Sequence, residues 1–131
     1  MKHIGSFGEY VTLSELLRRD IEAYPAILKN QEDYDITVIV SASKVVRLQV
    51  KTTELQNNST NNSVKGTDKN YDFLVLVVID NENVKFYVIP KKKVDDIRFN
   101  SVDLSVSRKN GSSYCVKNCF NDFENKWDLI K

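Results

Sequence analysis

The segment that most limits how this chain can fold is a pair of apolar runs, "YDITVIV" and "KVVRLQVKT", separated by "SAS". Both runs are rich in β-branched residues, so they predict an antiparallel hairpin from Tyr34 to Thr52. Side chains alternate across a strand, and Leu48 and Val50 therefore point to one face of the hairpin. Gln49 and Lys51 share the other face. The apolar face needs a cover from elsewhere in the chain.

A helix near the N-terminus is expected to supply that cover. Ser6 is followed three residues later by Glu9, the pattern of a capping box, which predicts a helix from about Phe7 to Arg19. Its apolar stripe consists of Val11, Leu13, Leu16 and Leu17. We expect this stripe to pack against the hairpin.

The remaining apolar runs complete a sheet. "DFLVLVVI" is almost continuously apolar, as expected of a strand covered on both faces, and "NEN" turns the chain into "VKFYVIP". A short strand around Ala23 to Ile27 is expected at an edge or a bulge, because Pro25 lacks a backbone N–H. "VDLSVS" predicts another strand, and Phe120, Phe123 and Trp127 are expected to pack against the body. The fold class is α/β, with a mixed β-sheet flanked by helices.

Length and composition indicate one globular domain over residues 1–131, with 41% hydrophobic and 28% charged residues. The polar stretch "ELQNNSTNNSVKGTDKN" predicts a flexible loop at about 54–70. No stretch approaches the roughly 18 apolar residues of a membrane span, so we expect a soluble, cytoplasmic protein with no membrane partner. Cys115, Cys119 and His3 are too few to complete a four-ligand zinc site.

The hairpin register predicts which polar residues face one another. With the turn centred on Ala42, Asp35 pairs with Gln49 and Thr37 pairs with Arg47. Directly paired side chains have Cβ atoms about 4.5–5.5 Å apart, close enough for two of them to hold one metal ion.

These residues supply hard oxygen ligands. Asp35 offers a carboxylate, Gln49 an amide oxygen and Val50 a backbone carbonyl, a set that suits Mg²⁺ or Mn²⁺. Lys51 lies one pleat further on, where a cation could orient or activate an attacking hydroxide and neutralise charge on a phosphodiester.

The helix opening "GSFGEYVTLSELLRR", then "YDITV" and then "RLQVKTT", resembles the PD-(D/E)XK nuclease superfamily, in its small-domain branch with the archaeal Holliday-junction resolvases. "FENKWDLI" also looks like the closing segment of uncharacterised bacterial members. The resemblance implies a restriction-endonuclease-like core and a divalent metal at one edge of its mixed sheet. It implies that Asp35 is the metal-binding aspartate, Lys51 the motif lysine and Glu9 the helical acid of the branch. Gln49 stands where the family usually has Glu or Asp, and Tyr34 replaces the usual proline.

Each site residue also has a plainer interpretation. Glu9 could only complete the capping box, Asp35 could only begin a strand, and Lys51 could be a solvated strand lysine. The net charge of +1 neither demands nor excludes a nucleic acid. The basic residues expected to contact phosphates are Lys44, Arg47, Lys65 and Lys69.

Two functions are consistent with these features. The first is Mg²⁺-dependent hydrolysis of nucleic acid, with DNA as the substrate that the resemblance implies; small domains of this kind often pair into homodimers to cut both strands. The second is a non-catalytic binding module of the same fold, such as an immunity protein or a partner subunit of a defence system. Gln49 and the modest net charge favour the module, whereas Asp35, Gln49 and Lys51 on one face favour the nuclease. Binding of metal at Asp35 would separate the two.

Overall fold

The structure is a computed structural model that describes residues 1–26, 33–56, 61–107 and 118–131. Its main sheet has five strands in the order β1-β2-β3-β5-β6. The bounds of these strands are Ala23–Pro25 (β1), Ile36–Ser41 (β2), Lys44–Leu55 (β3), Phe73–Asp80 (β5) and Asn83–Pro90 (β6). Strands β3 and β5 pair in parallel and the other neighbours pair antiparallel, so the sheet is mixed, as the sequence predicts. None of the helices within these ranges is long and apolar enough to cross a membrane.

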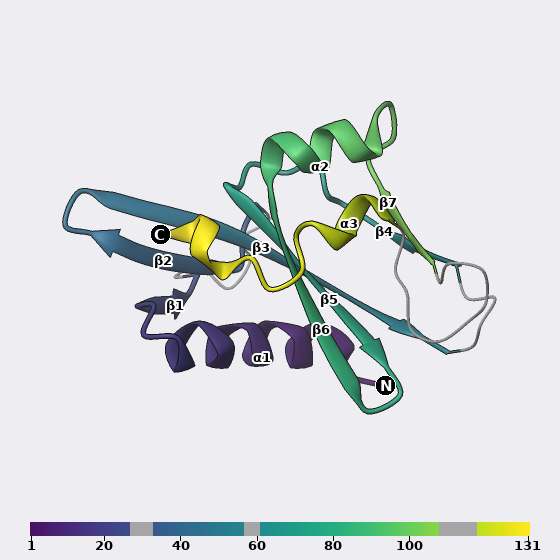
Figure 1. Cartoon of the computed structure of the whole chain (residues 1–131), viewed down its shortest axis with the longest axis horizontal. Coiled ribbons are helices and arrows are strands. Elements are labelled where there is room, and N and C mark those ends of the chain that lie inside the picture. The colour runs from purple at the N-terminus through teal and green to yellow at the C-terminus, as the bar shows by residue number, and fades with distance from the viewer. Residues whose placement is uncertain (27–32, 57–60, 108–117) are drawn as a thin grey trace.

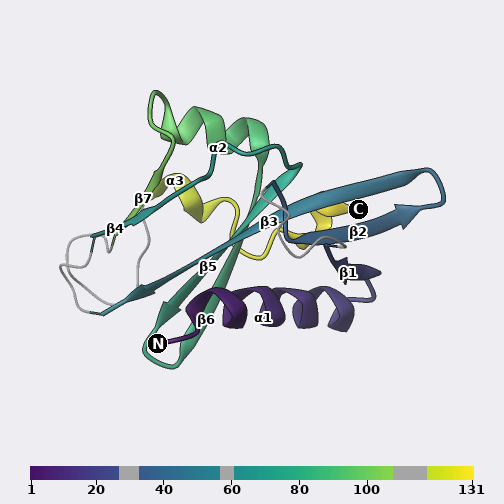
Figure 2. The ribbon, with the colours of Figure 1, turned by 180° about the vertical axis from the view of Figure 1, so that it is seen from behind.

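Helices cover both faces of the sheet (Figures 1 and 2). Helix α1 (Ile4–Arg18) lies along one face, and α2 (Lys91–Arg98) lies on the other side together with a two-stranded sheet of β4 (Asn61–Val64) and β7 (Leu104–Ser107). The chain continues into α3 (Asn118–Asn121) and a closing 3₁₀ turn, η1 (Trp127–Ile130). The strand order and flanking helices confirm the predicted α/β class.

Each face of the sheet has its own hydrophobic core. The core under α1 joins Leu16 to the inner face of the hairpin, including Val46, Leu48 and Val50, and to Trp127 of η1. The core on the opposite face joins strand β5 to Val94 of α2 and to β4 and β7. Strand β5 contributes to both cores, as its continuous apolar sequence predicts.

The start of α1 differs from the prediction. The helix begins at Ile4 with His3 as its N-cap, and no side chain caps it. Ser6 lies inside the helix, whereas a capping residue has non-helical backbone angles, so the predicted capping box is wrong. Glu9 is therefore not engaged at a helix cap. Within the apolar stripe, Leu16 is fully buried but Leu17 is exposed, because it lies beyond the edge of the buried face.

Part of the polar stretch predicted as a flexible loop at about 54–70 is regular structure. Strand β3 runs on to Leu55, and Asn61–Val64 form β4, which pairs with β7. Leu55 and Val64 are buried in the core on the α2 side, and the side chain of Asn62 donates hydrogen bonds to Thr53 Oγ1 and Glu54 O at 2.6 and 2.8 Å. A few well-spaced apolar residues therefore suffice when a second strand pairs with them. Residues 57–60 lie outside the described residues.

Candidate active site

The hairpin has the predicted register. Ile36 pairs with Leu48, Thr37 with Arg47 and Ile39 with Val45. Asp35 immediately precedes β2, and its backbone N–H donates to Leu48 O at 2.8 Å, one residue out of the register, because Leu48 is already the partner of Ile36. The predicted pairing of Asp35 with Gln49 lies beyond the last pair of the ladder, and the two residues meet through their side chains.

The carboxylate of Asp35 is held by β3. Oxygen Oδ2 accepts the backbone N–H of Val50 at 2.7 Å and the side-chain N–H of Gln49 at 3.3 Å. The N–H and C=O of a strand residue point to the same edge of the strand, so the Val50 carbonyl faces the edge that β2 leaves uncovered before Ile36. Carboxylate, amide and carbonyl oxygens thus belong to one short stretch of sheet edge.

The amide oxygen of Gln49 is the most informative atom of the site. Gln49 is only 5% exposed, and Oε1 is a buried atom without a hydrogen-bond partner among the described residues. Reversing the amide would place this oxygen against the Asp35 carboxylate, so the observed orientation is the favourable one. A buried acceptor without a donor costs about 1–3 kcal/mol, and a hard cation would satisfy it. The donor set therefore fits Mg²⁺ or Mn²⁺.

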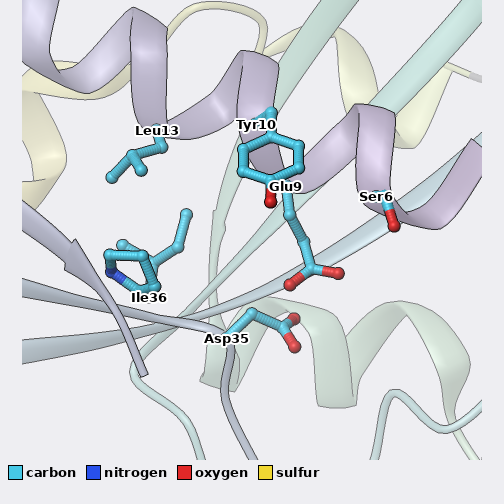
Figure 3. A pocket seen from close by; sticks show the side chains of 7 residues that line it. Ser6, Glu9, Tyr10, Leu13, Asp35 and Ile36 are labelled. Carbon is cyan, nitrogen blue, oxygen red and sulfur yellow. The ribbon is translucent and has the colours of Figure 1, made fainter. Parts of the chain in front are cut away.

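Glu9 reaches this edge from α1. Figure 3 shows its carboxylate pointing toward that of Asp35, in a pocket of about 150 Å³ between the helix, the end of β1 and the start of β2. Burial and the charge of Asp35 raise the pKa of Glu9, whereas the charge of Lys51 lowers that pKa. Two carboxylates that face one another repel when both are ionised, and a bound cation would remove this repulsion.

The pKa of Asp35 is also raised, and burial is the main cause. The Val50 N–H, the Lys51 ammonium and the Gln49 amide all lower the same pKa. Burial therefore outweighs three favourable contacts, which is the condition expected of a carboxylate placed to receive a cation.

Lys51 lies on the same face of β3 as Gln49 and is half-buried. Its ammonium lies 3.5 Å from the position that a Cβ would occupy on Gly66, a residue with φ of +69°. The N–H of Gly66 donates to Asp103 Oδ1 at 3.3 Å, which ties this turn to the segment before β7. Lys51 has no ion pair within the described residues, and its charge lowers the pKa of both nearby carboxylates.

The predicted phosphate-binding residues are not gathered in one place. Lys44 lies at the hairpin turn, and seven residues of strand at about 3.3 Å each separate it from Lys51, or roughly 23 Å. Lys65 is exposed and adjoins Gly66, and Lys69 follows in the next turn. Both belong to the segment that approaches Lys51.

Arg47 makes several contacts within the chain. Its backbone N–H donates to Asp72 Oδ2 at 2.8 Å, and its guanidinium lies 3.6 Å from the same oxygen and 3.5 Å from Asn70 Oδ1. The guanidinium also lies over the ring of Tyr34, 5.8 Å from its centroid. Arg47 thus joins the chain before β2 to the chain before β5.

Two features of the site were not predicted from the sequence. Gly8 lets α1 approach β3, because a Cβ there would overlap Thr52, and this contact sets the position of Glu9. The pocket is the second feature, with Ser6, Tyr10 and Leu13 on its helical wall and Pro25 and Ile36 opposite. A glycine directly before the candidate acid was a usable signal for the first; nothing in the sequence pattern indicated the second.

No cluster of three or more His, Cys, Asp or Glu side chains is found in the described ranges, consistent with a site completed by an amide.

Comparisons with known proteins establish the fold. No protein-family model and no curated protein matches the chain. Among solved structures, a bacterial homing endonuclease matches with a TM-score of 0.70 and 20% identity, over 99% of this chain and 90% of that chain. The Holliday junction resolvase Hjc of the archaeal hyperthermophile Archaeoglobus fulgidus matches with a TM-score of 0.53 and 10% identity, over 97% of this chain and 100% of that chain. The chain has the fold of PD-(D/E)XK-type nucleases, as the resemblance implies.

Proposed function

We propose that this protein, which has the fold of PD-(D/E)XK-type nucleases, hydrolyses phosphodiester bonds of nucleic acid with the help of Mg²⁺ or Mn²⁺. The observation that carries the proposal is the buried amide oxygen of Gln49, which lacks a hydrogen-bond donor and belongs to the side chain whose N–H donates to the Asp35 carboxylate. A binding module would gain nothing from an unsatisfied acceptor at this place, because the acceptor destabilises the fold unless a cation binds it.

Four groups would hold the cation: the carboxylates of Asp35 and Glu9, the amide oxygen of Gln49 and the carbonyl of Val50. When bound, the cation supplies positive charge to the scissile phosphate and lowers the pKa of the attacking water. Asp35 and Glu9 carry the negative charge that retains it. Gln49 orients Asp35 through its N–H and leaves its oxygen for the cation.

Lys51 acts on the phosphate side of the site. Its ammonium is half-buried, so its charge is less screened than that of a surface lysine. It stabilises the negative charge that develops on the phosphate oxygens and donates a hydrogen bond to the attacking water. Gly66 lies beside this ammonium.

DNA is the proposed substrate, since both structural neighbours are nucleases, one of them a Holliday junction resolvase. Lys65 and Lys69 lie toward Lys51 and would contact the phosphates nearest the site, and Lys44 would contact a phosphate further along. Cutting both strands of a duplex would require a second site, which a homodimer would supply.

The alternative is a binding module of the same fold that recognises a protein partner. A neutral Gln49 favours it, because the site then has one charge fewer than an acidic residue would give. Divalent metal bound at Asp35 would exclude the module interpretation.

The test measures cleavage and metal binding separately. Wild type should cut plasmid or branched DNA with Mg²⁺ or Mn²⁺ and lose this activity in chelator. Lys51→Ala should abolish turnover yet retain metal binding by calorimetry, and Asp35→Ala should abolish both. Lys92→Ala, which removes a charge from the exposed surface of α2, should leave turnover unchanged. If wild type and Asp35→Ala are equally inert on DNA and RNA, and neither binds a divalent ion, the nuclease proposal is wrong and the binding module replaces it.

A further inference from the structure

We propose that the pocket between α1, the end of β1 and the start of β2 holds one unpaired nucleobase next to the scissile phosphate. The inference rests on the proposed nuclease function and names its substrate class as DNA with an unpaired nucleotide at the cleavage site, as in a flap or a branch.

The pocket has two chemically different ends. Ser6, Glu9 and Asp35 form the polar end, which is the edge of the candidate metal site. The apolar end consists of Tyr10, Leu13, Pro25 and Ile36. Figure 3 shows Leu13 and Ile36 on opposite walls, with Tyr10 beside Glu9. A ligand that fills the pocket must therefore be flat or compact, mostly apolar, and linked to a group that binds at the metal.

Tyr10 is the clearest sign of an external ligand. Its side chain is 72% exposed although it is a large aromatic residue in the middle of α1, directly after Glu9. Aromatic side chains of this kind provide stacking surfaces for bases in proteins that bind single strands. Its hydroxyl and that of Ser6 can also form hydrogen bonds with the edge of a base.

The charges of the pocket favour a base over other parts of a nucleic acid. A second phosphate would be repelled by the carboxylates of Glu9 and Asp35, and its oxygens would find no donors on Leu13, Pro25 or Ile36. The bases of a continuous duplex stay stacked inside the helix, so a duplex would leave these apolar walls uncovered. An unpaired base has no base pair to break, so moving it into the pocket costs less than extruding a paired base, and it lies one sugar away from the phosphate at the polar end.

The experiment compares two DNAs of one sequence, a continuous duplex and a duplex with a short single-stranded flap, with 2-aminopurine at the flap junction. Binding is measured with Mg²⁺ in the Lys51→Ala background, so that the DNA stays intact. The flapped DNA should bind more tightly than the duplex, and 2-aminopurine fluorescence should change on binding. Tyr10→Ala should weaken flap binding by about tenfold or more, and duplex binding much less. Tyr10→Phe keeps the ring and should restore flap binding.

Phe99→Ala is the matched control, because Phe99 is an exposed aromatic residue, 79% exposed, at the end of α2. It should leave the ratio of flap to duplex affinity unchanged. In the Lys51→Ala background, equal affinity for the flapped DNA with and without Tyr10→Ala would overturn the pocket assignment. A loss of flap affinity in Phe99→Ala equal to that in Tyr10→Ala would overturn it as well. Cleavage by wild type tests the nuclease separately: cleavage that is indifferent to Tyr10→Ala overturns only the pocket. Flap binding that depends on Tyr10 without any cleavage supports the pocket and counts against the nuclease.

Discussion

Gly8 of α1 lies directly against Thr52 of β3, and no side chain larger than hydrogen fits between them. A Cβ at position 8 would overlap Thr52 Oγ1 and lie 2.9 Å from Thr52 Cβ. Because Glu9 follows Gly8 in the helix and Lys51 precedes Thr52 in the strand, this contact fixes the helical acid relative to the strand that bears the lysine. Packing of one glycine thus couples the stability of the fold to the geometry of the candidate site.

Gly8→Ala should therefore displace α1. We expect it to lower the free energy of unfolding by about 1–3 kcal/mol, the usual cost of overpacking, and to weaken metal binding because Glu9 moves with the helix. Gly5→Ala is the matched control in the same helix: no atom lies within 4 Å of its Cβ position, so the change should stabilise the protein by up to about 1 kcal/mol. Denaturant titration measures both. Thr52→Ala should restore part of the stability that Gly8→Ala loses; an unaltered loss would show that the contact is not the cause.

Leu16 and Leu17 form a second matched pair on α1. Leu16 is fully buried against the sheet, whereas Leu17 is 52% exposed. Leu16→Ala should lower the free energy of unfolding by about 2–5 kcal/mol through a cavity in the core. Leu17→Ala should change it by less than about 0.5 kcal/mol. Similar losses in the two variants, measured by urea titration, would contradict the packing of α1 on the hairpin.

The register of the hairpin could be predicted from the sequence, although the predicted turn was displaced and a bulge in β2 offsets this error. The prediction assumed a turn centred on Ala42, but Ser41 in fact pairs with Lys44 around a two-residue turn. An extra residue in β2, Val40 between Ile39 and Ser41, then restores the predicted pairing. Without that bulge, Ile36 would pair with Gln49 rather than with Leu48. A strong alternation of apolar residues selects the register even where the turn geometry is misjudged.

Other features depended on contacts distant in sequence. Strand β4 has one large apolar residue, Val64, and its pairing with β7 across about forty residues cannot be inferred from local composition. Ser6 matched a capping pattern, yet the helix begins at Ile4, three residues before the predicted start at Phe7. The backbone N–H of Phe7 bonds to His3 O at 3.0 Å and so forms the first turn. The close approach at Gly8 and the pocket beside Glu9 both depend on how α1 docks. Local pattern thus predicts the elements and the candidate ligands, and docking determines their surroundings.

The raised pKa of Asp35 predicts how the stability of the metal-free protein depends on pH. Burial makes the folded protein hold a proton on Asp35 at pH values where the unfolded chain has lost it. This group therefore destabilises the fold above its raised pKa, and the penalty disappears as the pH falls toward the ordinary value of 3.8. Asp35→Asn removes the charge and keeps an oxygen for the Val50 N–H. In chelator it should be more stable than wild type at neutral pH, with the difference vanishing in acid. Thermal unfolding across a pH series measures this, and a difference independent of pH would refute the explanation.

Gln49→Glu should give the site its full negative charge and make the fold depend more on metal. Without metal, the new carboxylate loses the N–H that Gln49 donates to Asp35 Oδ2 and faces that oxygen as a like charge. The metal-free variant should therefore unfold at a lower temperature than wild type. With Mg²⁺ or Mn²⁺ the charge favours binding, and every tenfold gain in affinity adds about 1.4 kcal/mol of stability at saturating metal. The rise in unfolding temperature on adding metal should be larger than in wild type.

Two further variants identify the atom responsible for this metal response. Gln49→Leu has a similar volume and removes both the unsatisfied oxygen and the N–H that bonds to Asp35 Oδ2, so its metal-free stability should stay close to that of wild type while its response to Mg²⁺ is reduced or lost. Gln56→Glu adds the same charge at an exposed position just past the end of β3 and should leave the metal response as it is in wild type. Calorimetric titration with Mg²⁺ and Mn²⁺, combined with thermal unfolding, measures all three. If Gln49→Leu kept the full response of wild type, Oε1 of Gln49 could not be a ligand, and its unsatisfied burial would need another explanation.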